Sequence, residues 1–107
     1  MIHYALHGGG PVNAPGQLVT PVSSIIVPAA TEYERRYLIV MADSANTAPI
    51  FLRLDSLPGS GDVEAVVGSG IIIYPGAWHE WVYTSMYKGA VYGISDSDSL
   101  VYWQEGR

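Results

Sequence analysis

The chain has 107 residues, of which 49% are hydrophobic and only 14% charged, and its formal net charge at pH 7 is −5. This length fits one domain, and the charged fraction is well below the roughly 25% of a typical soluble domain. The acidic balance argues against electrostatic binding of nucleic acid, and the absence of cysteine excludes disulfides, thiolate nucleophiles and cysteine-based zinc sites. We expect neither a signal peptide nor a membrane span, because no basic leader and no apolar run of ~20 residues occurs.

Residues 1–16 are predicted to form an extended N-terminal arm that precedes the domain proper, residues 17–107. Gly8, Gly9 and Gly10 are followed at once by Pro11, and a second turn-forming cluster ends at Gly16. Such an arm is either a frayed terminus or a segment that becomes ordered on a neighbouring subunit. Its apolar residues Ile2, Tyr4 and Leu6 are candidates for that contact.

Short runs rich in β-branched and aromatic residues follow the arm, separated by Gly, Pro, Ser and Asp. No segment shows a sustained helical period with caps. We predict strands over residues 17–27, 35–42, 50–55, 71–74, 78–83, 90–95 and 100–104, and either a short strand or part of a loop over residues 63–67. The predicted fold class is therefore all-β, an antiparallel β-sandwich (jelly-roll-like) of about eight strands.

Several of these strands are apolar on both faces. In residues 78–83, Trp78 and Val82 share one face, whereas Trp81 and Tyr83 share the other. A single small sandwich buries only one face of each sheet. The apolar residues on the outer face of each sheet then have three explanations: an assembly contact, a covering arm or loop, or exposure to water. We favour the assembly contact, because Tyr and Trp are enriched at interfaces.

No residue pattern indicates catalysis, a metal site or a cofactor. His79 is adjacent to Glu80, and neighbours in a strand point to opposite faces. The cupin type of metal barrel needs a second histidine near His79, which the sequence lacks. A calcium loop starting at Asp96 lacks its glycine and its distal glutamate. We therefore expect no enzymatic activity. The three tryptophans leave a carbohydrate-binding alternative open.

A resemblance to a known group of proteins rests on four motifs. They are an Arg-led strand (Arg35-Arg36-Tyr-Leu-Ile-Val), Ile50-Phe-Leu-Arg-Leu, Gly70-Ile-Ile-Ile-Tyr-Pro-Gly76, and Lys88-Gly-Ala-Val-Tyr-Gly-Ile94, with Glu80 before the last. Together they resemble the small β-sandwich proteins of tailed-bacteriophage virions, in particular capsid decoration (cement) proteins. The sequence departs from that pattern at Met41-Ala-Asp43, where relatives often place an asparagine.

The resemblance implies a structural role on the capsid surface of a virion, in a protein made in the host cytoplasm. The implied partners are the major capsid protein and further copies of the chain, with no nucleic acid and no membrane. A tail or fibre component that binds a host-surface glycan is the alternative. The residues expected at the partner interface are Ile2, Tyr4, Leu6, Arg35, Arg36 and the aromatics Phe51, Trp81 and Tyr83, which we expect to face outward.

Overall fold

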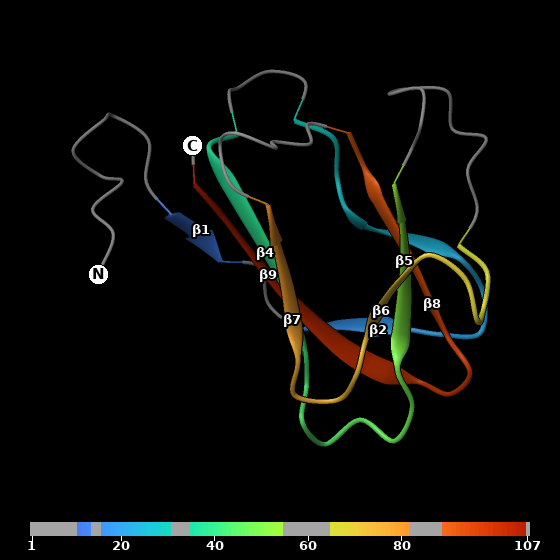
Figure 1. The fold of residues 1–107 in the computed structure, drawn as a ribbon. Coiled ribbons are helices and arrows are strands. Elements are labelled where there is room, and N and C mark those ends of the chain that lie inside the picture. Colours follow the sequence, from blue (N-terminus) through green and yellow to red (C-terminus); the bar gives the residue numbers. More distant parts are fainter. Residues whose placement is uncertain (1–10, 14–15, 31–34, 55–64, 82–88, 107) are drawn as a thin grey trace.

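The computed structural model describes residues 11–13, 16–30, 35–54, 65–81 and 89–106. These residues form nine strands in two antiparallel sheets packed face to face (Figure 1), which confirms the predicted all-β class. The described part of the chain contains no helix, and hence none long and apolar enough to cross a membrane. The strands are β1 (Pro11–Asn13), β2 (Gln17–Val19), β3 (Ser24–Val27), β4 (Tyr37–Ala42), β5 (Ile50–Leu54), β6 (Ile71–Ile73), β7 (Trp78–Trp81), β8 (Val91–Ser95) and β9 (Ser99–Gly106).

The first sheet, here called sheet A, is organised around β9. One edge of β9 pairs with β4, which in turn pairs with β7, and the other edge pairs with the short strands β1 and β2 in succession. The second sheet, sheet B, has the order β3-β8-β5-β6. Consecutive strands from β2 onward alternate between the sheets, except that β5 and β6 are neighbours in sheet B.

The predicted strand over residues 17–27 is wrong as a single element, because it is divided into β2 and β3 of different sheets. Residues 20–23 carry the chain between the sheets. Pro21 has no amide hydrogen for a sheet ladder, and the Thr20 hydroxyl accepts a hydrogen bond from the Val22 amide at 3.2 Å. This local bond replaces strand pairing at the crossing.

The structure also describes parts of two other predicted segments. Residues 65–67 belong to a loop and not to a strand, since the Ser69 amide donates to the Val66 carbonyl in a turn that contains Gly68 at φ 85°. Residues 11–13, within the predicted arm, pair with the last residues of β9. The rest of that arm up to residue 10, and residues 14–15, lie outside the described residues.

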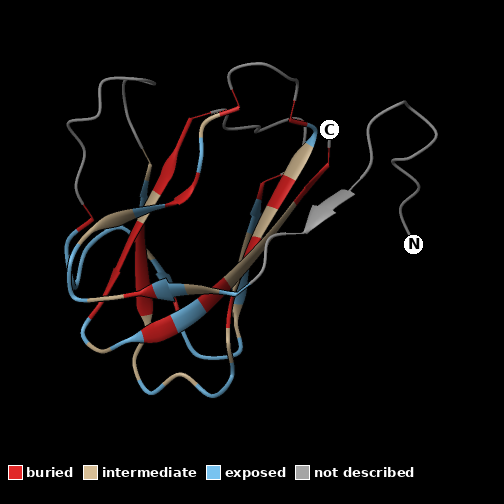
Figure 2. Cartoon of the chain, turned by 180° about the vertical axis from the view of Figure 1, so that it is seen from behind, coloured by how far each residue is buried: buried red, intermediate tan, exposed pale blue. Residues whose placement is uncertain are grey.

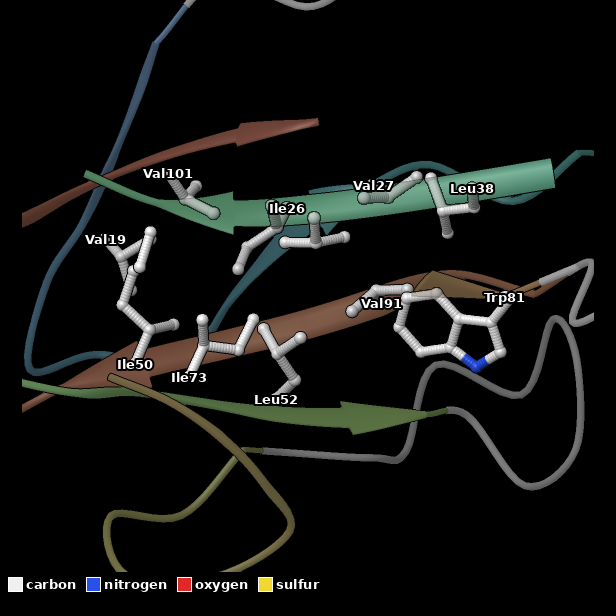
Figure 3. Packing of buried hydrophobic residues seen from close by; sticks show 12 residues of the cluster. Val19, Ile26, Val27, Leu38, Ile50, Leu52, Ile73, Trp81, Val91 and Val101 are labelled. Atoms are coloured by element: carbon white, nitrogen blue, oxygen red, sulfur yellow. The ribbon is translucent and has the colours of Figure 1, made fainter. Parts of the chain in front are cut away.

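The core lies between the two sheets and consists of alternate residues of their strands (Figure 3). Leu38, Val40 and Val101 of sheet A meet Ile50 and Leu52 of sheet B, and all five side chains are fully buried. Side chains of a strand alternate between faces. Ile39, Met41 and Leu100, which lie next to the buried Leu38, Val40 and Val101 in sequence, therefore face outward.

A buried ion pair joins the two sheets beside this core. The Nε atom of Arg35 donates to Oε1 of Glu105 at 2.9 Å, and neither side chain is exposed to solvent. The other guanidinium nitrogens donate to the Pro28 carbonyl at 2.7 Å and to the Gly89 carbonyl at 3.3 Å. Glu105 belongs to β9 of sheet A, whereas Pro28 and Gly89 adjoin β3 and β8 of sheet B. Among the described residues no buried side-chain polar atom lacks a hydrogen-bond partner.

We predict that Glu105→Gln destabilises the fold by about 3–5 kcal/mol, because it removes the Glu105 carboxylate from a buried guanidinium. The free energy of unfolding in urea measures this effect. Replacing both partners, as Arg35→Met with Glu105→Leu, removes both charges together and should cost less than the sum of the two single changes. Additive costs would show that the two side chains do not act as a pair.

A second prediction concerns Gly93 of β8, which faces the core. A β-carbon at this position would overlap Cδ1 of Ile26 and lie 2.8 Å from its Cγ1. We expect Gly93→Ala to cost about 1–3 kcal/mol through overpacking. Ile26→Val removes the overlapping methyl group, so Gly93→Ala should cost less in that background. An equal cost in both backgrounds, measured by denaturant unfolding, would contradict this steric explanation.

Candidate protein-interaction surface

The outward face of sheet A carries apolar side chains from four strands. We call this set the outer surface of sheet A, and it comprises Leu18, Ile39, Met41, Trp78, Leu100 and Tyr102. Trp78 is 61% exposed, Leu18 52% and Leu100 39%, while the other three are partly buried. Figure 2 shows where buried, intermediate and exposed positions lie along the strands.

Strand register arranges these side chains in rows. Trp78 lies opposite Met41, which lies opposite Tyr102, so that one row crosses β7, β4 and β9. Leu18 and Leu100 are paired across β2 and β9. Directly paired residues on one face have β-carbons about 4.5–5.5 Å apart, so each row is a continuous apolar contact area held by the sheet backbone.

Hydrogen bonds fix the polar rim of this surface. The Tyr102 hydroxyl donates to Oδ2 of Asp43 at 2.9 Å. The side-chain amide of Asn46 donates to the Leu100 carbonyl at 2.9 Å and accepts from the Leu100 amide at 2.8 Å. The loop after β4 is thereby attached to β9, and an apolar area bordered by polar groups results, which is the usual organisation of a protein interface.

A tight turn positions Trp78 at the start of β7. The Ala77 amide donates to the Tyr74 carbonyl at 2.9 Å, with Pro75 second in the turn and Gly76 third at φ 82°. Proline followed by a residue of positive φ is the pattern of a type II turn. The turn is also attached to β4, because the Gly76 amide donates to the Ala42 carbonyl. Trp78 therefore projects from a rigid base.

The outward face of sheet B is partly covered by the chain itself. Phe51 and Ile94, which point away from the main core, are 6% and 9% exposed because they form a second cluster with Ala65. The Ala65 amide donates to the Ser23 hydroxyl at 2.8 Å and holds this cover in place. Aliphatic residues stay exposed around it: Val22, Ile25, Val66, Val67 and Ile72, of which Ile72 lies opposite Phe51 and Ile25 opposite Tyr92 in register. Sheet A, with Trp, Tyr and Met among its outward residues, has the composition more typical of interfaces.

The structure describes four of the eight residues expected at an interface, and only one of the four is exposed. Trp81 faces the core and is 6% exposed, and its partner in register is the buried Leu38. Phe51 points outward but is covered, as described above. Arg35 is buried in its ion pair, whereas Arg36 is exposed. The remaining four expected residues, Ile2, Tyr4, Leu6 and Tyr83, lie outside the described residues.

Trp78 is an exposed aromatic residue of sheet A that the sequence-based assignment missed. Alternation placed Trp78 and Trp81 on opposite faces but did not say which face is outside. Glu80 indicates which face is outside. It shares the face of Trp78, and a carboxylate without a partner is costly to bury. His79 instead shares the face of Trp81, and the two rings meet edge to face at 4.5 Å between centroids.

Within the described ranges, no group of three or more His, Asp or Glu side chains is placed to hold a metal ion. The comparisons with known proteins add no relative, since no family model, no curated protein and no solved structure matches this chain. The apolar outer surface of sheet A is therefore the feature on which a functional proposal rests.

The Asp43–Tyr102 hydrogen bond yields a prediction about pH. The pKa of Asp43 lies below its ordinary value of 3.8, first because of the hydrogen bond from the Ala45 amide and second because of the Tyr102 hydroxyl. The same bond raises the pKa of Tyr102 above 10.0. A lowered carboxyl pKa stabilises the fold above pH 3.8, and this is lost as pH falls through the folded-state pKa. A raised phenol pKa stabilises the fold below pH 10.0, and this is lost as pH rises through the folded-state pKa.

We expect Tyr102→Phe to raise the pKa of Asp43 only part of the way to its ordinary value, since the larger cause, the Ala45 amide, remains. Titration of the Asp43 carboxyl carbon by NMR measures this shift. An unchanged pKa in the variant would mean that the Tyr102 bond does not form in solution.

Proposed function

We propose that the chain is a structural protein of a tailed-phage virion, a capsid decoration (cement) protein. It binds the major capsid protein and copies of itself on the capsid surface, and it stabilises the lattice by burying apolar surface between subunits. In this proposal the domain is a jelly-roll-like sandwich with an extended N-terminal arm, made in the host cytoplasm before it joins the particle.

The outer surface of sheet A is the observation that carries the proposal. It presents Trp78, Leu18 and Leu100 to solvent on a rigid sheet, and contiguous apolar area of this kind marks interaction sites. The low charged fraction of the chain agrees with a surface that is partly covered in use.

The strand order supports the fold assigned in this proposal. One sheet has the order β2-β9-β4-β7 and the other β3-β8-β5-β6, which corresponds to two interleaved Greek keys of eight strands. Jelly rolls of this kind occur in viral capsid proteins and in lectins. Because one fold serves many functions, the strand order supports the proposal only together with the apolar surface and the resemblance of the sequence motifs.

The alternative is a tail or fibre component that binds a host-surface glycan. Its supporting observation is the exposure of two aromatic side chains near one turn, since Tyr74 and Trp78 are each 61% exposed. Aromatic faces stack on sugars, and the polar residues Asp43 and Asn46 lie on the loop after β4, to which this turn is attached. A glycan array or a polysaccharide pull-down would identify this activity.

The cement function predicts that the purified chain sediments with intact capsids and raises their melting temperature. Trp78→Ser should weaken capsid binding about 30-fold, the effect of losing an interface residue worth about 2 kcal/mol. The stability of the free chain should change little, because Trp78 is exposed.

Ile72→Ser is the matched control for this experiment, because Ile72 is 42% exposed on sheet B. This control should bind capsids as the unaltered chain does. Equal binding by Trp78→Ser and the unaltered chain would remove sheet A from the mechanism. Binding to polysaccharide together with no affinity for capsids would replace the cement function by the alternative.

A further inference from the structure

The outer surface of sheet A is too small to join two copies by flat contact alone. Four strands spaced about 4.8 Å apart and about six residues long give a face on the order of 400 Å². A stable specific interface buries roughly 800 Å² on each partner. Projecting side chains add to the area of a flat face. The area buried by such a contact nevertheless stays at the small end of the range for stable interfaces. A further segment of chain would supply the missing area.

We propose that residues 1–7 of a second copy occupy this surface, so that each copy places its N-terminal arm across sheet A of a neighbour. The proposal deepens the proposed function and rests on it for the role of the surface. It names one partner, another copy of the chain, and one segment of that partner.

The sequence of this segment matches the surface in pattern. Ile2, Tyr4 and Leu6 alternate with His3, Ala5 and His7, so an extended segment would present three apolar side chains on one side. Residues two apart in an extended chain are separated by about 6.6 Å. The same separation holds between successive outward residues of one strand, such as Leu100 and Tyr102 of β9, so the arm residues can follow a strand of this surface.

Charge favours this segment over other parts of a second copy. The chain carries a net charge of −5, and two copies therefore repel each other. Residues 1–10 contain none of the ten acidic residues and two of the three histidines. The outer surface of sheet A has a single charged residue among the outward positions of β2, β4, β7 and β9, the carboxylate Glu80. Contact between residues 1–10 of one copy and this surface of another therefore brings no two carboxylates together.

The direction of β1 favours a neighbour over the chain's own surface. Pro11 is paired with Gly106, at the end of sheet A, and β1 runs from there toward Asn13 opposite Gln104. The end of β1 nearest to residues 1–10 is therefore at the end of sheet A, beside the last residue of β9. Ten residues extend about 33 Å, enough to reach across an adjoining copy.

The absence of cysteine from the chain permits a direct test by crosslinking. A Tyr4→Cys variant is mixed with a Leu100→Cys variant that carries a tag, and the mixture is oxidised mildly in the absence of capsids. We expect disulfide-linked heterodimers of the two variants. The control mixes Tyr4→Cys with Ile72→Cys, whose position on sheet B is as exposed as Leu100, at 42% against 39%. Heterodimers should be several-fold fewer in the control.

Two results would overturn the proposal. One is equal crosslinking in the two mixtures. The other is a monomeric intrachain disulfide as the sole product of the double variant Tyr4→Cys/Leu100→Cys, which would show that the arm covers its own sheet.

Self-association measured by sedimentation provides an independent readout. Replacing Ile2 and Leu6 by Ser should weaken it at least tenfold, whereas His3→Ser with Ala5→Ser, on the other side of the alternation, should leave it nearly unchanged. If both double variants weakened self-association equally, the proposal that Ile2, Tyr4 and Leu6 face the neighbouring sheet would be wrong. Failure of capsid binding with the crosslink intact would count against the cement function and not against the exchange of arms.

Discussion

The ion pair between Arg35 and Glu105 is the constraint on which the arrangement of the two sheets depends. One guanidinium binds a carboxylate in sheet A and two backbone carbonyls next to strands of sheet B, and both charged side chains are buried. Charges removed from water are tolerated only when every hydrogen-bonding group is matched. The ion pair therefore restricts the two sheets to one relative position at this end of the domain. Apolar packing alone would allow several relative positions.

The same pair also affects the outside of the molecule. Glu105 lies opposite Leu38 in the β4–β9 register, and that register places Met41 opposite Tyr102. A shift of one residue would turn every side chain of β9 to the other face. The outward row of aromatic and sulfur-containing side chains thus depends on a register that the buried Glu105 helps to fix. The position of the buried Glu105 and the set of outward side chains on sheet A therefore both depend on the register between β4 and β9.

Local sequence patterns predicted the strands and their alternation, but not which face is inside. The runs around β4, β5 and β8 are recognisable from composition, and the opposition of Trp78 and Trp81 follows from their spacing. The inside face depends on partners far away in the chain: Trp81 is buried because it lies opposite Leu38. Arg35 is buried because Glu105, 70 residues later, reaches it. An arginine at the start of a strand gives no local sign of such a partner.

The position of β9 in sheet A determines when the domain can fold. This last strand of the described chain pairs with β1, β2 and β4, so that of the strands in its sheet only β7 does not touch it. Sheet A therefore has no centre, and Arg35 lacks the Glu105 carboxylate, until residues 99–106 have been synthesised. Pairings so distant in sequence form slowly, because the long intervening loops must close first. The domain consequently completes its fold after its C-terminal strand has left the ribosome, and a nascent chain that stops earlier exposes the apolar strands of both sheets.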